Sequence, residues 1–436
     1  MNQSGEEQER SVWSWLLRQI SSVGLIHLIS IPLSVLVAIV LARVMGPAQY
    51  GQYAFLISIL ALIALPAVMG VAQLLTREAA RYKELDSWGH YIGIRRVGLV
   101  WVLVISSSVL LLAYLLAQMI LGARLEAIGA AFWLGLCLVP INGLLAVHQG
   151  LAKGVGFPGL AEAPMKVLVP LFLLMSVLSL SAINQVSVYT VMTSQVAVSL
   201  VTVLLAFAIL LKVEPSAPTN TVPLYDLNLW GRVYIPLMLT GLVGTLNAQI
   251  GTVLLGTLSE DAAVAGLRVA ERASQFVVMP LVVINAVIAP LAVTFYARKD
   301  ERGMQSVFQK ATRGAFAIAL VMGALFIVFG QSAIAFLFGE EYVDLAYTPL
   351  VILALAHVFN VAAGPVGVVL LMCHQEKLAL LSQALGFAIT AALAVLLIPV
   401  YDQVGAALAI AAGLVIWNTL MTIFVRQKLG ISVGVF

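Results

Sequence analysis

Residues 266–300 read GLRVAERASQFVVMPLVVINAVIAPLAVTFYARKD, and this stretch decides the class of fold. Its first turns carry Arg268, Glu271 and Arg272, and no further charge follows before Arg298. An α-helix rises about 1.5 Å per residue, so roughly 20 mainly apolar residues cross the hydrocarbon core of a membrane. The stretch therefore predicts a membrane-spanning helix with three charges near one end.

The composition of the whole chain points to the same class. Hydrophobic residues make up 62% of the 436 residues and charged residues only 10%, so polar side chains cannot cover the surface in water. We predict an all-α integral membrane protein with about twelve transmembrane helices. The predicted spans, read from apolar runs, are 24–42, 53–75, 97–121, 127–151, 167–183, 188–211, 233–258, 262–296, 315–338, 346–372, 378–400 and 404–425.

Lysine and arginine residues predict the orientation, because cytoplasmic loops retain positive charge during insertion. With the N-terminus inside, the outer loops hold only Arg43 and Arg124, and the other lysines and arginines outside the spans lie on the inner face. We therefore expect both termini to be cytoplasmic. The net charge of +3 reflects this topology and implies no nucleic-acid partner.

The chain also contains a weak internal repeat. Residues 43–83 run parallel to residues 258–299, with Gly51 opposite Gly266, and each segment leads from a short outer turn through a long span to a basic inner loop. Because each half holds an even number of spans, both halves enter the membrane from the same side.

The repeat predicts two pseudo-symmetric six-helix lobes around a central cavity. The lobes are residues 1–211 and 229–436, and residues 212–228, rich in proline and polar residues, are expected to form a cytoplasmic linker. Two bundles joined in this way can rock about a shared cleft, which is the architecture of alternating access.

Three stretches resemble a known family. They are ARVMGPAQYGQYAF (42–55), the stretch 266–300 quoted above, and FGEEYVDLAYTPLVILALAHVFNVAAGPVGVVLLM (338–372). They are similar to the first outer turn and to the eighth and tenth helices of bacterial polysaccharide flippases of the Wzx type, in the multidrug/oligosaccharidyl-lipid/polysaccharide (MOP) exporter superfamily. Where many relatives carry a small polar residue and a glycine after the tenth helix, this chain has Cys373 and His374.

This resemblance implies a MOP/MATE-like transporter and not an enzyme. The implied cargo is an oligosaccharide repeat unit on undecaprenyl pyrophosphate, moved from the inner to the outer leaflet of the bacterial cytoplasmic (inner) membrane. The implied process is assembly of O-antigen (lipopolysaccharide), capsule or exopolysaccharide, with a polysaccharide polymerase and a chain-length regulator as partners. Because the sequence has no nucleotide-binding motif, we expect the energy to come from an ion gradient, with H⁺ or Na⁺ as the candidate coupling ions, from the membrane potential or from the flux of cargo, and we expect no cofactor.

A lipid-linked diphosphate needs a cation where it crosses the membrane, because an unpaired charge in hydrocarbon costs several kcal/mol. Arg268 and Arg272 are four residues apart and share a helix face, so both are proposed diphosphate ligands, with Glu271 holding one of them when the cavity is empty. Counted from Ala262, they would lie roughly 9 Å and 15 Å deep. Alternatively, residues 274–296 alone form the span, both arginines lie at the outer mouth with their charged groups in water, and Glu271 forms a surface ion pair with Arg268 or with Arg272.

Other polar residues within the spans are weaker candidates. His357 can take up a proton as part of ion coupling, or it can bond a neighbouring helix. The remaining candidates can line the cleft and bond sugar hydroxyls, or they can hold helices together; they are Asn142, Asn247, Gln249, Asn285 and Asn360.

Two other classes of function compete with the flippase. A drug or cation exporter of the same superfamily would favour an acidic cavity, whereas the deepest charges here are mostly basic. A membrane scaffold would need no charge in a cleft. Enzymes are disfavoured because the sequence has no phosphate-cradling glycine loop, no metal-ligand cluster and no large extramembrane domain, and the only cysteines, Cys137 and Cys373, fall in apolar segments.

Overall fold

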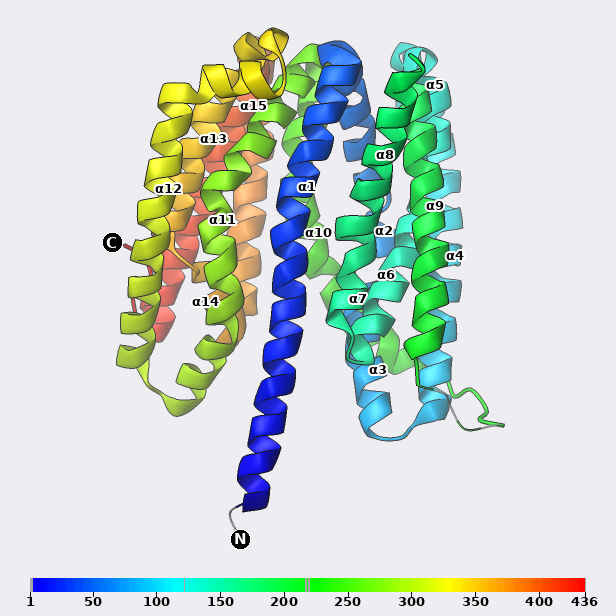
Figure 1. Cartoon of the computed structure of the whole chain (residues 1–436), viewed down its shortest axis with the longest axis vertical. Helices are drawn as coiled ribbons and strands as arrows, with labels where there is room; N and C mark the ends of the chain where they lie inside the picture. The colour runs from blue at the N-terminus through cyan, green and yellow to red at the C-terminus, as the bar shows by residue number, and fades with distance from the viewer. Residues whose placement is uncertain (1–2, 121, 216–217, 219, 436) are drawn as a thin grey trace. The chain divides into compact units, whose positions relative to one another are not determined.

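A computed structural model of the chain describes residues 3–120, 122–215, 218 and 220–435, and every regular element in them is a helix (Figure 1). The helices of the first half are α1 (Gln3–Ile63), α2 (Leu65–Val68), α3 (Val71–Glu84), α4 (Trp88–Ile120), α5 (Gly122–Gly135), α6 (Leu138–Gly154), α7 (Pro158–Ala163), the π-helical turn η1 (Pro164–Leu168), α8 (Val169–Ala182) and α9 (Val188–Val213). Those of the second half are α10 (Leu227–Leu258), α11 (Asp261–Arg298), α12 (Glu301–Leu337), the 3₁₀ turn η2 (Glu340–Tyr342), α13 (Val343–Ala363), α14 (Val366–Met372) and α15 (Glu376–Leu429).

Two of these helices each contain a kink where two spans were predicted. In α1 the kink is at Gly46, whose φ of 71° suits glycine, and Pro47 then starts the next helical segment. In α15 the kink is at Asp402, between the predicted spans 378–400 and 404–425.

The hydropathy of the helices confirms the predicted class. Ten helices in the described part of the chain are long and apolar enough to cross a membrane, and the two kinked helices are among them. With two spans in each kinked helix, this agrees with the prediction of about twelve. The chain is a multi-pass integral membrane protein.

Helix ends follow local chemistry. Ser187 caps α9, because its hydroxyl accepts from the backbone N–H of Thr190 and the Thr190 hydroxyl accepts from the Ser187 backbone N–H. The Asp300 carboxylate accepts from the Gly303 backbone N–H at 2.8 Å and begins α12. Gly364, whose φ is 80°, and the Pro365 that follows it separate α13 from α14. The single span predicted over 346–372 therefore consists of two helices.

By their internal contacts the residues form two compact units. Unit 1 comprises residues 1–37 and 60–242, and unit 2 comprises residues 38–59 and 243–436. Each unit takes in a short segment from the other half of the sequence. The predicted division into lobes at the linker 212–228 stays a prediction.

Each unit has its own apolar core. In unit 1, α3, α4 and α6 pack around Leu75, Tyr91 and Leu151, and the indole Nε1 of Trp230 donates to the Tyr82 hydroxyl at 2.9 Å. In unit 2, α11, α12, α13 and α15 pack against one another.

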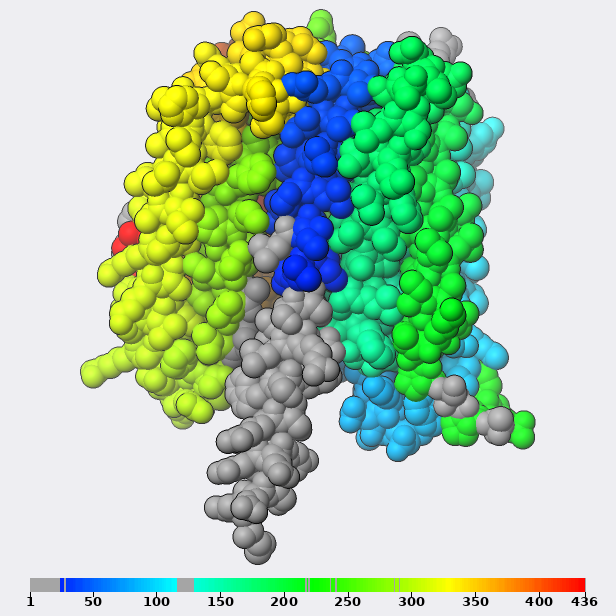
Figure 2. Space-filling model, viewed as in Figure 1, coloured from blue at the N-terminus to red at the C-terminus, as the bar shows by residue number. Residues whose placement is uncertain are grey.

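The outward side of α12 is strongly apolar. Figure 2 shows this helix in yellow on the surface of unit 2, and Val321, Val328, Phe329 and Phe336 are between 57% and 78% exposed. A soluble protein rarely exposes such a contiguous apolar patch, so lipid is the natural solvent of this face.

Candidate functional site

A cluster of polar side chains surrounds Arg268 inside unit 2. The guanidinium group of Arg268 donates to the Glu271 carboxylate at 3.0 Å and to the Gln249 side-chain oxygen at 2.8 Å. It also donates to the hydroxyl of Ser58. The side chains of Arg268 and Glu271 are only 13% and 20% exposed, so their contact is not a solvated surface pair.

Ser58, the partner of Arg268 that belongs to α1, is held in place by a second hydrogen bond. The Ser58 hydroxyl is fully buried and donates to the Ala54 carbonyl oxygen at 2.7 Å, which leaves its oxygen to accept from Arg268. Within unit 2, α1 approaches α11 closely at Gly51, where a Cβ atom would lie 1.7 Å from the backbone oxygen of Asp261. A glycine is therefore required for α1 to carry Ser58 to this position.

Arg272 lies one helical turn further along α11 and has a different environment. Within the described residues, no hydrogen bond or ion pair engages its guanidinium group. It interacts electrostatically with Arg268, Glu271, Tyr50 and Tyr53, and both tyrosines are buried. Since the Glu271 carboxylate is already bonded to Arg268, Arg272 is a half-buried cation whose N–H donors are open to a ligand.

A separate cavity of about 370 Å³ in unit 2 is lined by amide side chains. Three of the predicted residues, Asn247, Asn285 and Asn360, line it together with Gln383 and Asn418. The Asn247 amide donates to the backbone oxygens of Val243 and Gln383, at 3.0 and 3.2 Å. The side-chain oxygen of Asn285 is buried, and no described residue donates to it.

The structure separates the predicted residues into different places. Gln249 accepts a hydrogen bond from Arg268, whereas Asn247 lines the amide cavity. These residues are two positions apart in sequence, which corresponds to a rotation of about 200° around a helix, so their side chains leave α10 on nearly opposite sides. Asn142 is in unit 1, on α6, half-buried. His357 is on α13, and its Nδ1 atom is buried without a partner among the described residues.

Sequence reasoning missed several polar residues at these places. Gln383 and Asn418 lie within the predicted spans 378–400 and 404–425, so the rule that selected Asn285 would also have selected them. Ser58 gave no such signal, because a lone serine in an apolar helix usually bonds its own backbone.

Solved structures of known proteins share this arrangement of helices. An inward-facing multidrug resistance MATE family transporter of the MOP superfamily aligns with a TM-score of 0.73 and 14% identity, over 91% of this chain and 94% of the other. The lipid II flippase MurJ, in an inward closed conformation, aligns with a TM-score of 0.72 and 13% identity, over 92% of this chain and 87% of the other. A MOP superfamily transporter from Pyrococcus furiosus aligns with a TM-score of 0.67 and 15% identity, over 95% of both chains.

At these identities the alignments establish the fold alone, which this chain shares with MOP-superfamily transporters. No curated protein matches the chain. A family model described as polysaccharide biosynthesis protein matches residues 16–296, and the chain therefore belongs to this family.

Proposed function

We propose that the protein is a flippase for an oligosaccharide repeat unit linked to undecaprenyl pyrophosphate. It moves this cargo from the inner to the outer leaflet of the bacterial cytoplasmic membrane by alternating access of two lobes, residues 1–211 and 229–436, joined by the linker 212–228. The product is used in the assembly of O-antigen, capsule or exopolysaccharide, next to a polymerase and a chain-length regulator. Both termini are cytoplasmic, and the energy comes from an ion gradient of H⁺ or Na⁺, from the membrane potential or from the flux of cargo.

One observation carries this proposal: Arg272 is a half-buried cation that forms no ion pair or hydrogen bond with a described side chain. A buried charge without a counterion is costly, so such a residue is retained where an anionic ligand supplies the missing charge. A guanidinium group matches phosphate oxygens in a two-pronged geometry. We therefore assign Arg272 as the diphosphate ligand and Arg268, with its three partners, as the residue that fixes the local structure.

The family and the amide cavity support the glycan part of the cargo. The chain belongs to a family described as polysaccharide biosynthesis protein, and the structurally similar MurJ is by name a lipid II flippase. Amide groups both donate and accept hydrogen bonds, as sugar hydroxyls require, and the unpartnered oxygen of Asn285 is an open acceptor. Asn247, Asn285 and Asn360 are the proposed sugar contacts, and Asn142 is a further one in unit 1.

Substitution of the two arginines tests the assignment. In a strain that depends on this protein, Arg272→Ala should reduce surface glycan delivery roughly tenfold at equal protein level, as expected for the loss of about 1.4 kcal/mol of cargo binding. Arg272→Lys should keep part of the delivery, because the charge remains. Arg268→Ala should instead lower the amount and thermal stability of the protein, since Ser58, Gln249 and Glu271 lose their partner. Arg298→Ala, an exposed cation at the other end of α11, is the matched control.

Normal delivery by Arg272→Ala at equal protein level would overturn the assignment. If the wild-type protein instead lowered cell sensitivity to cationic drugs and its deletion left surface glycan unchanged, the exporter alternative would replace the flippase. If the protein were a membrane scaffold, Arg272→Ala would change neither the delivery of surface glycan nor the sensitivity of the cells to cationic drugs.

A further inference from the structure

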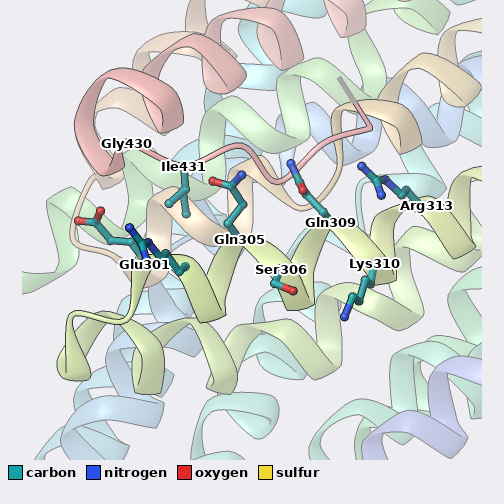
Figure 3. Close-up of a pocket in the computed structure, with 9 residues that line it drawn as sticks. Glu301, Gln305, Ser306, Gln309, Lys310, Arg313, Gly430 and Ile431 are labelled. Atoms are coloured by element: carbon teal, nitrogen blue, oxygen red, sulfur yellow. The ribbon is translucent and has the colours of Figure 1, made fainter.

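A basic cavity lies in unit 2, away from the residues assigned to cargo. It has a volume of about 480 Å³ and lies between the first turns of α12 and the segment that follows α15 (Figure 3). Three exposed cations, Arg302, Lys310 and Arg313, line it together with Gln305, Ser306, Gln309 and one acid, Glu301.

The cations are arranged in one stripe and form no ion pair with any residue that the structure describes. Residues 302, 306, 310 and 313 follow helical spacing, so they share one face of α12. No Asp or Glu stands three or four residues from Arg302, Lys310 or Arg313, and no described residue forms an ion pair with them. Lys310 and Arg313 are three residues apart and repel each other, so an anion bound between them would be stabilising. Glu301 lies about 14 Å or more along the helix from both and does not neutralise them.

The opposite wall of the cavity is held in place by specific hydrogen bonds. The backbone N–H of Ser432 donates to the Gln305 side-chain oxygen at 3.3 Å, and the Thr312 hydroxyl donates to the Val433 carbonyl oxygen at 2.8 Å. The Val435 backbone N–H donates to the Ala362 carbonyl oxygen at 2.8 Å. In Figure 3, Gln309 and Arg313 lie on the side of α12 that faces this segment. The cavity is therefore a formed pocket with a fixed wall.

The depth of the stripe indicates what kind of anion it meets. From residue 314 to residue 337, α12 has no charged residue, a length of about 36 Å that covers the hydrocarbon core of about 30 Å. Arg313 and Lys310 therefore lie at the edge of the apolar layer, at the level of lipid headgroups. The same stripe continues into the membrane as exposed apolar side chains, among them Leu320, Val321 and Val328, which provide a surface for an acyl chain.

We propose that Lys310 and Arg313 bind the phosphate of an anionic phospholipid, with Gln309 and Ser306 as neutral hydrogen-bond partners and the exposed apolar stripe of α12 as the path of its acyl chain. A free phosphate ion has the same charged group as the lipid headgroup but has no acyl chain that could lie along this apolar stripe. Such a lipid links α12 to the C-terminal segment and stabilises unit 2. The site is independent of the proposed cargo and of the direction of transport.

The test measures lipid retention by the purified full-length protein. Native mass spectrometry after incubation with equal phosphatidylglycerol and phosphatidylcholine should show preferential retention of phosphatidylglycerol by the wild type. The double variant Lys310→Gln/Arg313→Gln should bind it roughly tenfold more weakly, because two charge-assisted contacts are lost. Arg298→Gln/Lys299→Gln removes the same charge from exposed positions at the end of α11, outside the pocket, and should retain the lipid as the wild type does.

Thermal unfolding in detergent separates the two sources of phosphate. Phosphatidylglycerol should raise the unfolding temperature of the wild type and of the Arg298→Gln/Lys299→Gln control but not that of the pocket variant, and inorganic phosphate at the same concentration should have no effect. Equal protection by inorganic phosphate would overturn the lipid assignment. Equal lipid retention by the pocket variant and the wild type, or no preference for the anionic lipid, would overturn the site itself.

Discussion

Arg268 and Arg272 differ in what surrounds them although they lie one helical turn apart on α11. Arg268 has three side-chain hydrogen-bond partners, one of them 210 residues away in sequence, and Arg272 has no hydrogen-bond partner among the described residues. The sequence predicted that both share one helix face and that Glu271 holds one of them. It could not predict which one, because the choice depends on where α1 and α10 place Ser58 and Gln249.

Substitution of Ser58 tests the structural role of Arg268. Ser58→Ala should destabilise the detergent-purified protein by about 1.5–3 kcal/mol, because a hydrogen bond to a charged group is lost in a buried place. Ser106→Ala is the matched control, since this hydroxyl is also buried but has no partner among the described residues. Thermal unfolding followed by circular dichroism measures both. Equal unfolding temperatures for the two variants would show that the contact with Arg268 contributes nothing.

At the scale of helices, close approaches of glycine position the candidate site. Gly51 and Gly266, which the internal repeat pairs, both lie where two helices of unit 2 touch: a Cβ atom would be 1.7 Å from the Asp261 oxygen at Gly51 and 2.5 Å from the Leu345 oxygen at Gly266. The helices themselves were predictable from apolar runs, because length and hydropathy suffice in a membrane. The sequence predicted two separate spans on either side of Gly46 and of Asp402. It did not predict that each pair of spans forms one helix with a kink, because only a single residue departs from helical φ and ψ angles.

A single methyl group at Gly51 should disturb this packing. Gly51→Ala should lower the unfolding temperature and the yield of folded protein, at a cost of about 1–3 kcal/mol, because the backbone of Asp261 must move. The control is Gly314→Ala in α12, where nothing lies within 4 Å of the added methyl and alanine favours the helix by about 0.5–1 kcal/mol. Size-exclusion chromatography and thermal unfolding compare the two variants. A Gly51→Ala protein as stable as the Gly314→Ala protein would contradict the close approach.

At the scale of the whole molecule, the distribution of polarity determined what could be predicted. Composition and hydropathy predicted a multi-pass all-helical membrane protein, and the structure and the match to MOP-superfamily folds confirm it. Long-range contacts could not be predicted, since an apolar helix can pack against many others. For this reason the amide cavity, whose amide side chains come from α10, α11, α13 and α15, was only partly predicted from single polar residues.

The orientation of the protein in the membrane is testable with two loops at opposite ends of α9. This helix has 26 residues and a length of about 39 Å, so the loop before it, which contains Gln185, and the segment after it, which contains Val222, lie on opposite sides of the bilayer. Both side chains are exposed, Val222 to 72%. In a Cys137→Ser/Cys373→Ala background, a membrane-impermeant maleimide should label Gln185→Cys in intact spheroplasts and Val222→Cys only after permeabilisation, because the basic loops stay cytoplasmic. The reverse pattern would place the basic loops outside and invert the proposed direction of transport, and labelling of both would mean that α9 does not cross the membrane.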